Sequence, residues 1–300
     1  MTRSSHPRTR RLRALTGASV MAAGIIAIIP AAAQATPVAC SETALVAAIN
    51  LANTTPASDT LNLASGCTYA MTSSHGDAAN GQEALPVITT PIEMIGPATI
   101  TRSSIFSFRI AEVSNTGALT LTTSVALTNG NAIGNGGGIL NRGAVTLTVS
   151  SLSGNSATGN GGGLANADTP SGTAPAASFT SSPVTNNTAG GNGGGLYNGQ
   201  RGTLTTTGVT GSPLFIRDNT STGLLGLLFG RGGGVAAVNS TATTLTETAV
   251  TVNHASALLF GTAGGVYREG GTMTTTNSPI SANTPNNCVG STPAVPNCTG

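Results

Sequence analysis

The 300-residue sequence contains no tryptophan and no lysine, and only 3% of its residues are aromatic. Charged residues make up 7% of the chain, and all twelve basic residues are arginine. So few cations exclude the clustered positive surface that nucleic-acid binding requires. The scarcity of aromatic rings also counts against a cleft that stacks on sugars.

Glycine is abundant, with 41 residues, and it recurs in one phrase. The phrase reads NGGGILN, NGGGLAN and NGGGLYN in its three clearest copies, at residues 135–141, 160–166 and 192–198. Looser copies occur at residues 231–235 and 262–266, so that successive copies are 25, 32, 39 and 31 residues apart. A repeat of this length indicates a solenoid, a propeller or another repeat array.

Short Thr-apolar-Thr segments between the glycines indicate which kind of array this is. A second apolar residue follows the first by five positions in most copies, as in Leu147 and Leu152. Along one strand an odd offset would point these side chains to opposite faces, so the chain must turn a corner between them. The residues are β-formers rather than helix formers, and the flanking threonines are predicted to face outward. The predicted core residues are Leu121, Leu147, Leu152, Phe179, Val184, Leu204, Val209, Leu245, Val250 and Met273.

The asparagines of the phrase add a second regularity. Asn141, Asn166 and Asn198 each follow the first glycine of their copy by five positions, and in-phase asparagines can form a hydrogen-bonded ladder between coils. Together these patterns predict an all-β fold, a right-handed parallel β-helix with a short N-terminal capping helix. The phrase resembles the GG-[AIL] and Asn repeats of secreted bacterial β-helix proteins, within the pectate-lyase-like superfold that includes polymorphic outer-membrane-protein repeats. The resemblance covers roughly residues 85–285 and implies the fold, which hosts lyases, hydrolases, adhesins and inert scaffolds alike.

The N-terminal 35 residues predict a secretory signal peptide. Five arginines precede an apolar run at residues 20–29, and a small-x-small site precedes Thr36. The apolar run is too short for a membrane span, so an uncleaved anchor is the weaker alternative, and the route of export stays open. The remaining chain has seven arginines against ten acidic residues, a net charge of −3. We therefore expect a secreted, extracellular protein with no membrane span and no nucleic-acid partner.

Four cysteines remain in the exported chain. An even number in this compartment favours disulfides, and proximity in the sequence favours Cys40–Cys67 and Cys288–Cys298. No Cys-x-x-Cys motif or Cys/His cluster is present, so neither a metal site nor a cofactor is predicted.

The domain organisation follows from the need to close both ends of a solenoid. Residues 41–52 predict a helix that Ser41 caps, with Leu45, Ala48, Ile49 and Ala52 on one apolar face. Residues 36–84 are predicted to form this cap and the first coils, residues 85–285 the β-helix, and residues 286–300 a disulfide-closed loop. Residues 60–63, 86–89, 92–95 and 98–102 are predicted to belong to early, irregular coils.

An enzyme that cleaves polysaccharide would need clustered acids, with an arginine or lysine base if it is a lyase. The acidic residues of the mature chain rarely occupy equivalent positions in adjacent coils. The clearest neighbouring pairs of opposite charge are Arg217–Asp218 and Arg268–Glu269. Exposed turn charges explain such pairs equally well, so no catalytic residue is assigned. A groove that gathers two acids and an arginine would favour the enzyme.

Two further features suggest binding. Leu-Leu-Phe-Gly occurs at residues 227–230 and 258–261, which indicates either an extra buried strand or an exposed apolar strip. The predicted binding surface comprises Arg217, Asp218, Leu227, Phe229, Arg231, His254, Leu258 and Phe260.

Thr-x-Thr segments such as 244–248 and 272–276 resemble the arrays of ice-binding β-helices, although Val149, Ser178 and Ser181 are predicted to interrupt the array. The leading hypothesis is a non-catalytic surface, adhesion or ligand-binding scaffold, with an extracellular polysaccharide or a cell-surface protein as partner. A polysaccharide lyase or glycoside hydrolase is the alternative, binding to ice or another crystal surface is a minor one, and the oligomeric state stays open.

Overall fold

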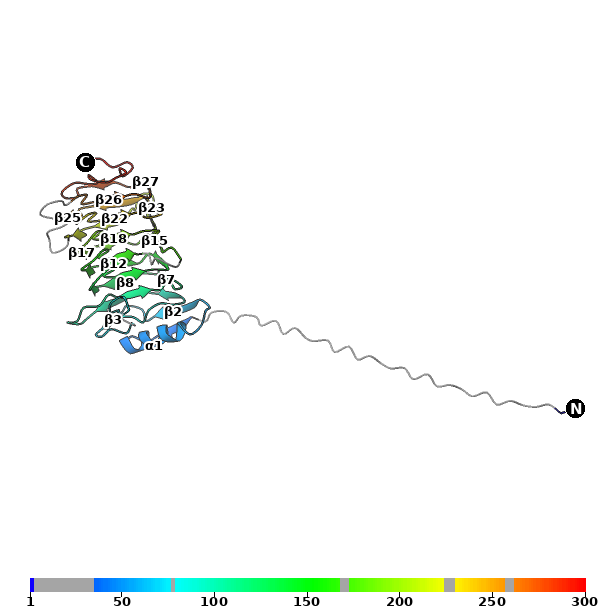
Figure 1. Ribbon diagram of the computed structural model, residues 1–300. Coiled ribbons are helices and arrows are strands. Elements are labelled where there is room, and N and C mark those ends of the chain that lie inside the picture. The colour runs from blue at the N-terminus through cyan, green and yellow to red at the C-terminus, as the bar shows by residue number, and fades with distance from the viewer. Residues whose placement is uncertain (3–34, 77–78, 168–172, 224–229, 257–261) are drawn as a thin grey trace. The chain divides into compact units, whose positions relative to one another are not determined.

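The computed structural model describes residues 1–2, 35–76, 79–167, 173–223, 230–256 and 262–300. The chain divides into two compact units, Met1–Ala32 and Ala33–Gly300, and every described helix and strand belongs to the second. That unit contains one helix, α1 (Glu42–Ala52), and parallel strands in four sheets, which confirms the predicted parallel β-helix. Figure 1 shows the coils stacked between α1 at one end and the C-terminus at the other.

The four sheets, here named A to D, run along the stack of coils. Sheet A contains β1 (Thr36–Val38), β2 (Asp59–Leu63), β4 (Pro91–Ile95), β7 (Ala118–Thr122), β11 (Ala144–Thr148), β15 (Ala176–Thr180), β19 (Thr203–Thr207), β23 (Ala242–Thr246) and β27 (Thr272–Thr276). Sheet B contains β3 (Cys67–Met71), β5 (Ala98–Arg102), β8 (Val125–Thr128), β12 (Ser151–Ser153), β16 (Val184–Thr185), β20 (Leu214–Arg217), β24 (Thr248–Thr251) and β28 (Ile280–Ser281). Sheet C contains β6 (Ala111–Val113), β10 (Ile139–Asn141), β14 (Leu164–Asn166), β18 (Leu196–Asn198), β22 (Val235–Val238) and β26 (Val266–Glu269). Sheet D contains β9 (Asn131–Ala132), β13 (Ser156–Ala157), β17 (Thr188–Ala189), β21 (Thr220–Ser221) and β25 (His254–Ala255).

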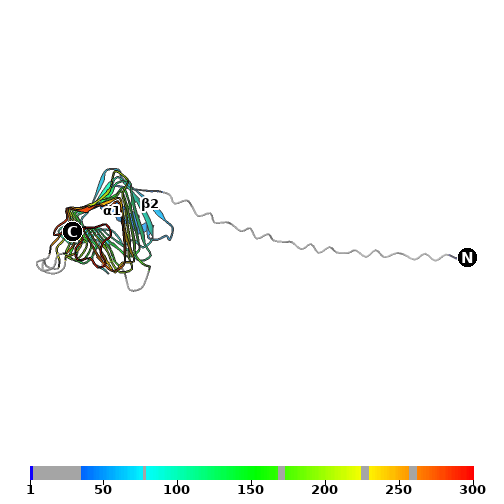
Figure 2. The ribbon, with the colours of Figure 1, turned by 90° about the horizontal axis from the view of Figure 1, so that it is seen from above.

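A regular coil visits sheets A, B, D and C in that order, and the next strand then pairs with the first. Seen along the stack in Figure 2, the strands of successive coils lie over one another. The corner between sheets A and B passes through a residue of positive φ, such as Val149 (φ 50°) or Ser181 (φ 47°). Leu147 and Leu152, on either side of that corner, are both fully buried. The corner that their odd spacing predicted is therefore present.

Two details of the repeat alignment were wrong. In the structure Phe179 pairs with Thr206 and not with Leu204, and Met273 pairs with Thr243. A slip of two residues leaves every side chain on the same face, so the alternating pattern alone does not detect it. Val209 was predicted to be core but is 56% exposed, and Ile216 pairs with Val184 in its place. Residues 86–89, predicted to belong to the early, irregular coils, form no strand and have only a single bridge.

Hydrogen-bonded asparagine ladders connect successive coils at two of the corners. Asn141 Nδ2 donates to Asn166 Oδ1 (2.7 Å), and Asn166 Nδ2 donates to Asn198 Oδ1 (2.8 Å), as the sequence predicted. A second ladder, which the sequence analysis missed, follows the corner between sheets B and D. There each amide donates to the side-chain oxygen of the next asparagine over 2.9 to 3.1 Å, through Asn155, Asn187, Asn219, Asn253, Asn283 and Asn287.

Each end of the solenoid has one of the two predicted disulfides. Disulfides join Cys40 to Cys67 and Cys288 to Cys298. Ser41 Oγ accepts a hydrogen bond from Ala44 N (3.2 Å) and caps α1, whose Leu45, Ile49 and Ala52 are buried. At the start of α1, partial burial would raise the pKa of Glu42, but hydrogen bonds from Thr72, His75 and Ser73 lower it to about 2. This carboxylate therefore fastens the helix to the chain that follows β3.

Candidate functional site

The outer face of sheet A carries two continuous columns of hydroxyl side chains. They lie on six successive strands, from β7 to β27, and each strand contributes a Thr-x-Thr or Ser-x-Thr pair. One column contains Thr120, Thr146, Ser178, Thr205, Thr244 and Thr274, and the other contains Thr122, Thr148, Thr180, Thr207, Thr246 and Thr276. We call these twelve side chains the threonine face.

The threonine face has a regular two-dimensional spacing. Neighbouring strands of a sheet lie about 4.8 Å apart, and alternate residues of one strand lie about 6.7 Å apart. None of the twelve side chains is buried. Within the described parts of the chain only Thr122 among them has a side-chain hydrogen bond, to Glu93 (3.4 Å). The other hydroxyls are therefore available to water or to a ligand.

The support beneath these hydroxyls is rigid. Leu121, Leu147, Phe179 and Leu245, which alternate with the threonines, are all fully buried in the continuous core. Threonine is branched at Cβ, so its side chain has few rotamers. The hydroxyl and methyl groups are consequently held in place before any ligand arrives.

The structure corrects the prediction that this array is interrupted. Val149 and Ser181 lie in the corners after β11 and β15, outside both columns. Ser178 is in the array but keeps a hydroxyl there. Thr248 was placed in the array, yet it lies in β24 of sheet B and is fully buried. Thr272 belongs to a neighbouring column in which it pairs with Ala242.

Sheet B lacks this regularity. Its outward positions include Phe215, which is 43% exposed, and Arg217, whose side chain is 56% exposed. The two columns of sheet A carry neither a charge nor an aromatic ring over the same coils. The threonine face is therefore not a general consequence of outward-facing strand positions in this chain.

No family model, curated protein or solved structure matches this chain. A β-helix by itself supports many activities, so the function follows from the geometry of this chain's own surfaces.

A second group of polar residues, the buried charged cluster, lies in the N-terminal coils. Arg109 Nη1 forms an ion pair with Glu83 Oε1 and lies 3.5 Å from Glu112 Oε2. Its Nη2 donates to the carbonyl oxygens of Asn80 (2.8 Å) and Asn135 (3.3 Å), and Asn80 Nδ2 donates to Glu112 (2.7 Å). The sequence analysis did not single out these residues, although two acids and an arginine meet here. Their side chains are only 0 to 4% exposed, so they line no open groove.

The protonation of this cluster follows from its burial. Burial and a hydrogen bond with Glu112 raise the pKa of Glu83, the charge of Arg109 lowers it, and together they bring it to about 8. Glu83 is therefore protonated at neutral pH, which leaves one positive arginine facing one negative carboxylate. One oxygen of Glu83, Oε2, has no hydrogen-bond partner. Unfolding at neutral pH would release the Glu83 proton to water.

The raised pKa of Glu83 predicts a pH dependence of stability. The contribution of protonated Glu83 to the free energy of unfolding is fully present below its pKa in the unfolded chain, 4.5, and is lost as the pH rises through about 8. Glu83→Gln removes this titration. The free energy of unfolding of the variant should therefore rise relative to that of the wild type, by up to about 1.4 kcal/mol for each pH unit between 4.5 and about 8. Urea unfolding of both proteins from pH 5 to 9 measures the difference. Parallel pH profiles would contradict the protonation of Glu83.

The structure describes only four of the eight residues of the predicted binding surface. Arg217 and Asp218 form an exposed ion pair (3.5 Å) at the end of β20. Arg231 contacts Tyr267 and Glu269 of β26 through its guanidinium group, with 2.8 Å to the Tyr267 hydroxyl. His254 is exposed on sheet D, as expected. The remaining four predicted residues lie outside the described residues, namely Leu227, Phe229, Leu258 and Phe260.

The described residues offer neither a metal site nor a membrane-spanning helix. The described residues contain no group of three or more His, Cys, Asp or Glu side chains that could hold a metal ion. Among the same residues no helix is long and apolar enough to cross a membrane.

Proposed function

We propose that this chain is a non-catalytic extracellular binding protein, that the threonine face is its binding surface, and that the ligand is ice. The observation that carries the proposal is the pair of uninterrupted hydroxyl columns on six paired strands of sheet A.

The repetition of the threonine face suits a ligand that is itself periodic in two dimensions. A single small molecule would touch only a few of the twelve positions, which leaves the remaining order unexplained. A crystal surface offers hydrogen-bonding groups at fixed intervals in both directions. Each threonine supplies a hydroxyl that binds a water molecule and a methyl group that packs against the next one. Because the array is rigid, ordering water on it costs little reorganisation.

Among ordered ligands, ice fits better than a sugar polymer. Binding to the flat face of a polysaccharide uses aromatic platforms, and neither threonine column contains an aromatic residue. The columns also carry no charge that would select an acidic polymer. Water in a crystal needs only hydroxyl groups and small apolar groups at regular spacing.

The extracellular location is part of the proposal. The two disulfides fit an oxidising compartment, since such bonds persist mainly outside the cytosol. The predicted signal peptide at residues 1–35, and the resemblance of the glycine phrase to secreted bacterial β-helix repeats, support the same location. A protein that meets ice crystals has to be outside the cell or on its surface.

The alternative of a polysaccharide lyase or hydrolase has weaker support. The acids and the arginine that such chemistry requires are gathered at Glu83, Arg109 and Glu112, where the side chains are enclosed and satisfy one another. A substrate would need to reach these atoms through protein. The enclosure of the cluster supports a structural role for it.

A substitution in the threonine face tests the proposal. Thr205 lies between Ser178 and Thr244 in its column, so Thr205→Tyr would raise a bulky ring above the plane. We expect inhibition of ice recrystallisation to fall to a small fraction of the wild-type value. The melting temperature should change little, because exposed substitutions usually alter stability by less than about 0.5 kcal/mol.

The matched control is Thr185→Tyr, which makes the same change on β16 of sheet B. It should keep wild-type activity on ice. Equal loss in both variants, or no loss in Thr205→Tyr, would contradict the assignment of the threonine face as the binding surface.

A further inference from the structure

An exposed apolar groove lies on the N-terminal coils. Ile105, Phe106 and Ile133 are 92%, 68% and 73% exposed, and they line a groove of about 570 Å³ together with Gly81, Gln82 and Ser107. Large apolar side chains that converge on one concave surface mark an interaction site more often than scattered ones do. None of these residues belongs to the threonine face.

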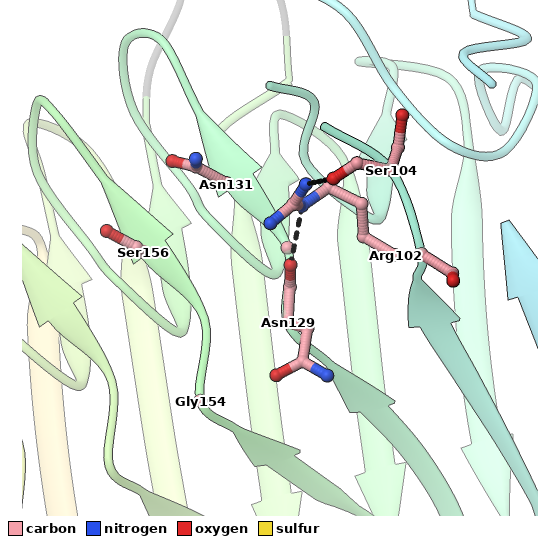
Figure 3. Close-up of a pocket in the computed structure, with 8 residues that line it drawn as sticks. Arg102, Ser104, Asn129, Asn131, Gly154 and Ser156 are labelled. Carbon is pink, nitrogen blue, oxygen red and sulfur yellow. Dashed lines mark hydrogen bonds between the residues drawn. The ribbon is translucent and has the colours of Figure 1, made fainter. Parts of the chain in front are cut away.

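A fixed cation adjoins this groove. Arg102 Nε donates to the carbonyl oxygen of Asn129 (2.8 Å), and Nη1 donates to the carbonyl oxygens of Ser104 and Phe106. Figure 3 shows the guanidinium held by Asn129 and Ser104 in a cleft that Asn131 and Ser156 also line. Arg102 also lies over the Phe108 ring, 5.9 Å from its centroid, but no described carboxylate contacts it and its Nη2 has no described hydrogen bond, so its charge has no counter-charge.

One wall of the polar cleft and one wall of the apolar groove are formed by consecutive residues of the chain, although the two have no lining residue in common. The cleft has a volume of about 450 Å³ and includes Ser103 and Ser104, and the next residues along the chain, Ile105 and Phe106, line the groove. Across from this wall, Asn131 lines the cleft and Ile133 lines the groove. Asn131 Nδ2 donates to Ser107 Oγ (3.2 Å), which ties the two sides together. An anion-binding group therefore lies directly beside an apolar surface.

We propose that the cleft and the groove form one binding site for an amphiphilic carboxylate, a monoanionic head group with an aliphatic tail. The head would accept hydrogen bonds from Arg102 Nη2 and from the surrounding hydroxyl and amide groups. The tail would cover Ile105, Phe106 and Ile133. A second copy of this chain fits less well, because a symmetric contact here would bring two uncompensated arginines together. The proposal is independent of binding to ice.

Three probes separate the contributions of head and tail. Octanoate has both, octanol has the tail without the charge, and acetate has the head without the tail. Calorimetric titration of the wild-type protein should show octanoate binding at least about ten-fold more tightly than octanol, as a charge-assisted hydrogen bond allows. The affinity for octanoate should also exceed the affinity for acetate, by about four-fold for each methylene that is buried.

Two variants assign these contributions to residues. Arg102→Met should remove the advantage of octanoate over octanol, and Ile133→Ser should reduce the advantage of octanoate over acetate. Arg217→Met, a matched change at an exposed arginine of sheet B, should alter neither. Should Arg102→Met fail to fold, the comparison of the three probes on the wild type still decides the proposal.

Three results would overturn it. The first is equal binding of octanoate and octanol to the wild-type protein, and the second is unchanged octanoate binding by a folded Arg102→Met variant. The third is a concentration-dependent dimer that Ile133→Ser dissociates, which would assign the groove to a second copy of the chain.

Discussion

Replacing Asn187 by alanine is expected to lower the free energy of unfolding by about 3–6 kcal/mol, because several buried groups lose their partners together. The fully buried Asn187 accepts hydrogen bonds from Asn155 N (2.9 Å) and Asn155 Nδ2 (3.1 Å). Its own amide donates to Leu152 O (3.1 Å) and Asn219 Oδ1 (3.0 Å). A loss of this size is a large fraction of the roughly 5–15 kcal/mol by which a domain is stable.

Urea or thermal unfolding of the purified protein measures this loss. Asn115→Ala is the matched control, because Asn115 is exposed in a turn and has no side-chain hydrogen bond among the described residues. It should change stability by no more than about 0.5 kcal/mol. A similarly small change in Asn187→Ala would show that the ladder contributes little beyond the backbone pairing of the coils.

Arg109→Met is the second substitution expected to have a large effect. It removes the only cation in direct contact with Glu83 among the described residues and leaves Glu112 with the more distant Arg142 (3.8 Å). Breaking a buried ion pair by removing one partner typically costs about 3–5 kcal/mol, since the remaining charge stays buried without compensation. We therefore expect a lower melting temperature and a deficit that grows as the pH rises and Glu83 ionises.

Arg217→Met provides the comparison for this experiment. Arg217 pairs with Asp218 at the surface, where an ion pair contributes about 0–1 kcal/mol. Melting curves of both variants at pH 6 and pH 9 test the account. A deficit in Arg109→Met that is small, or that does not depend on pH, would indicate that Glu83 and Glu112 are solvated or neutral without the arginine.

The fold was predictable because its signals are local and repeated. Three patterns each predict the same coil geometry: the glycine phrase, the Thr-apolar-Thr segments and the odd spacing of Leu147 and Leu152. The register between coils was less predictable. A two-residue slip keeps the inward and outward faces, so Leu204 was aligned with Phe179 although Thr206 occupies that position. Buried threonines also satisfy one another, as in the 2.8 Å contact between the Thr206 and Thr248 hydroxyls.

The candidate sites were less predictable than the fold for the same reason. The Thr-x-Thr pairs are visible in the sequence, but only the register shows that Val149 and Ser181 fall at corners and leave the columns intact. Glu83 and Arg109 are 26 residues apart and meet because one coil lies on the next. A signal for them did exist, since Arg109 and Glu112 interrupt an apolar stretch at residues 105–113 and charged residues in such a place are usually paired.

The most direct test of the central claim is whether the wild-type protein enters growing ice. A fluorescently labelled sample of the oxidised chain, produced from Thr36 onward, is frozen slowly onto a cold finger beside a labelled protein of similar size that has no ice-binding surface. We expect this chain to become enriched in the ice while the comparison protein is expelled into the liquid. Equal exclusion of both proteins from the ice would contradict it.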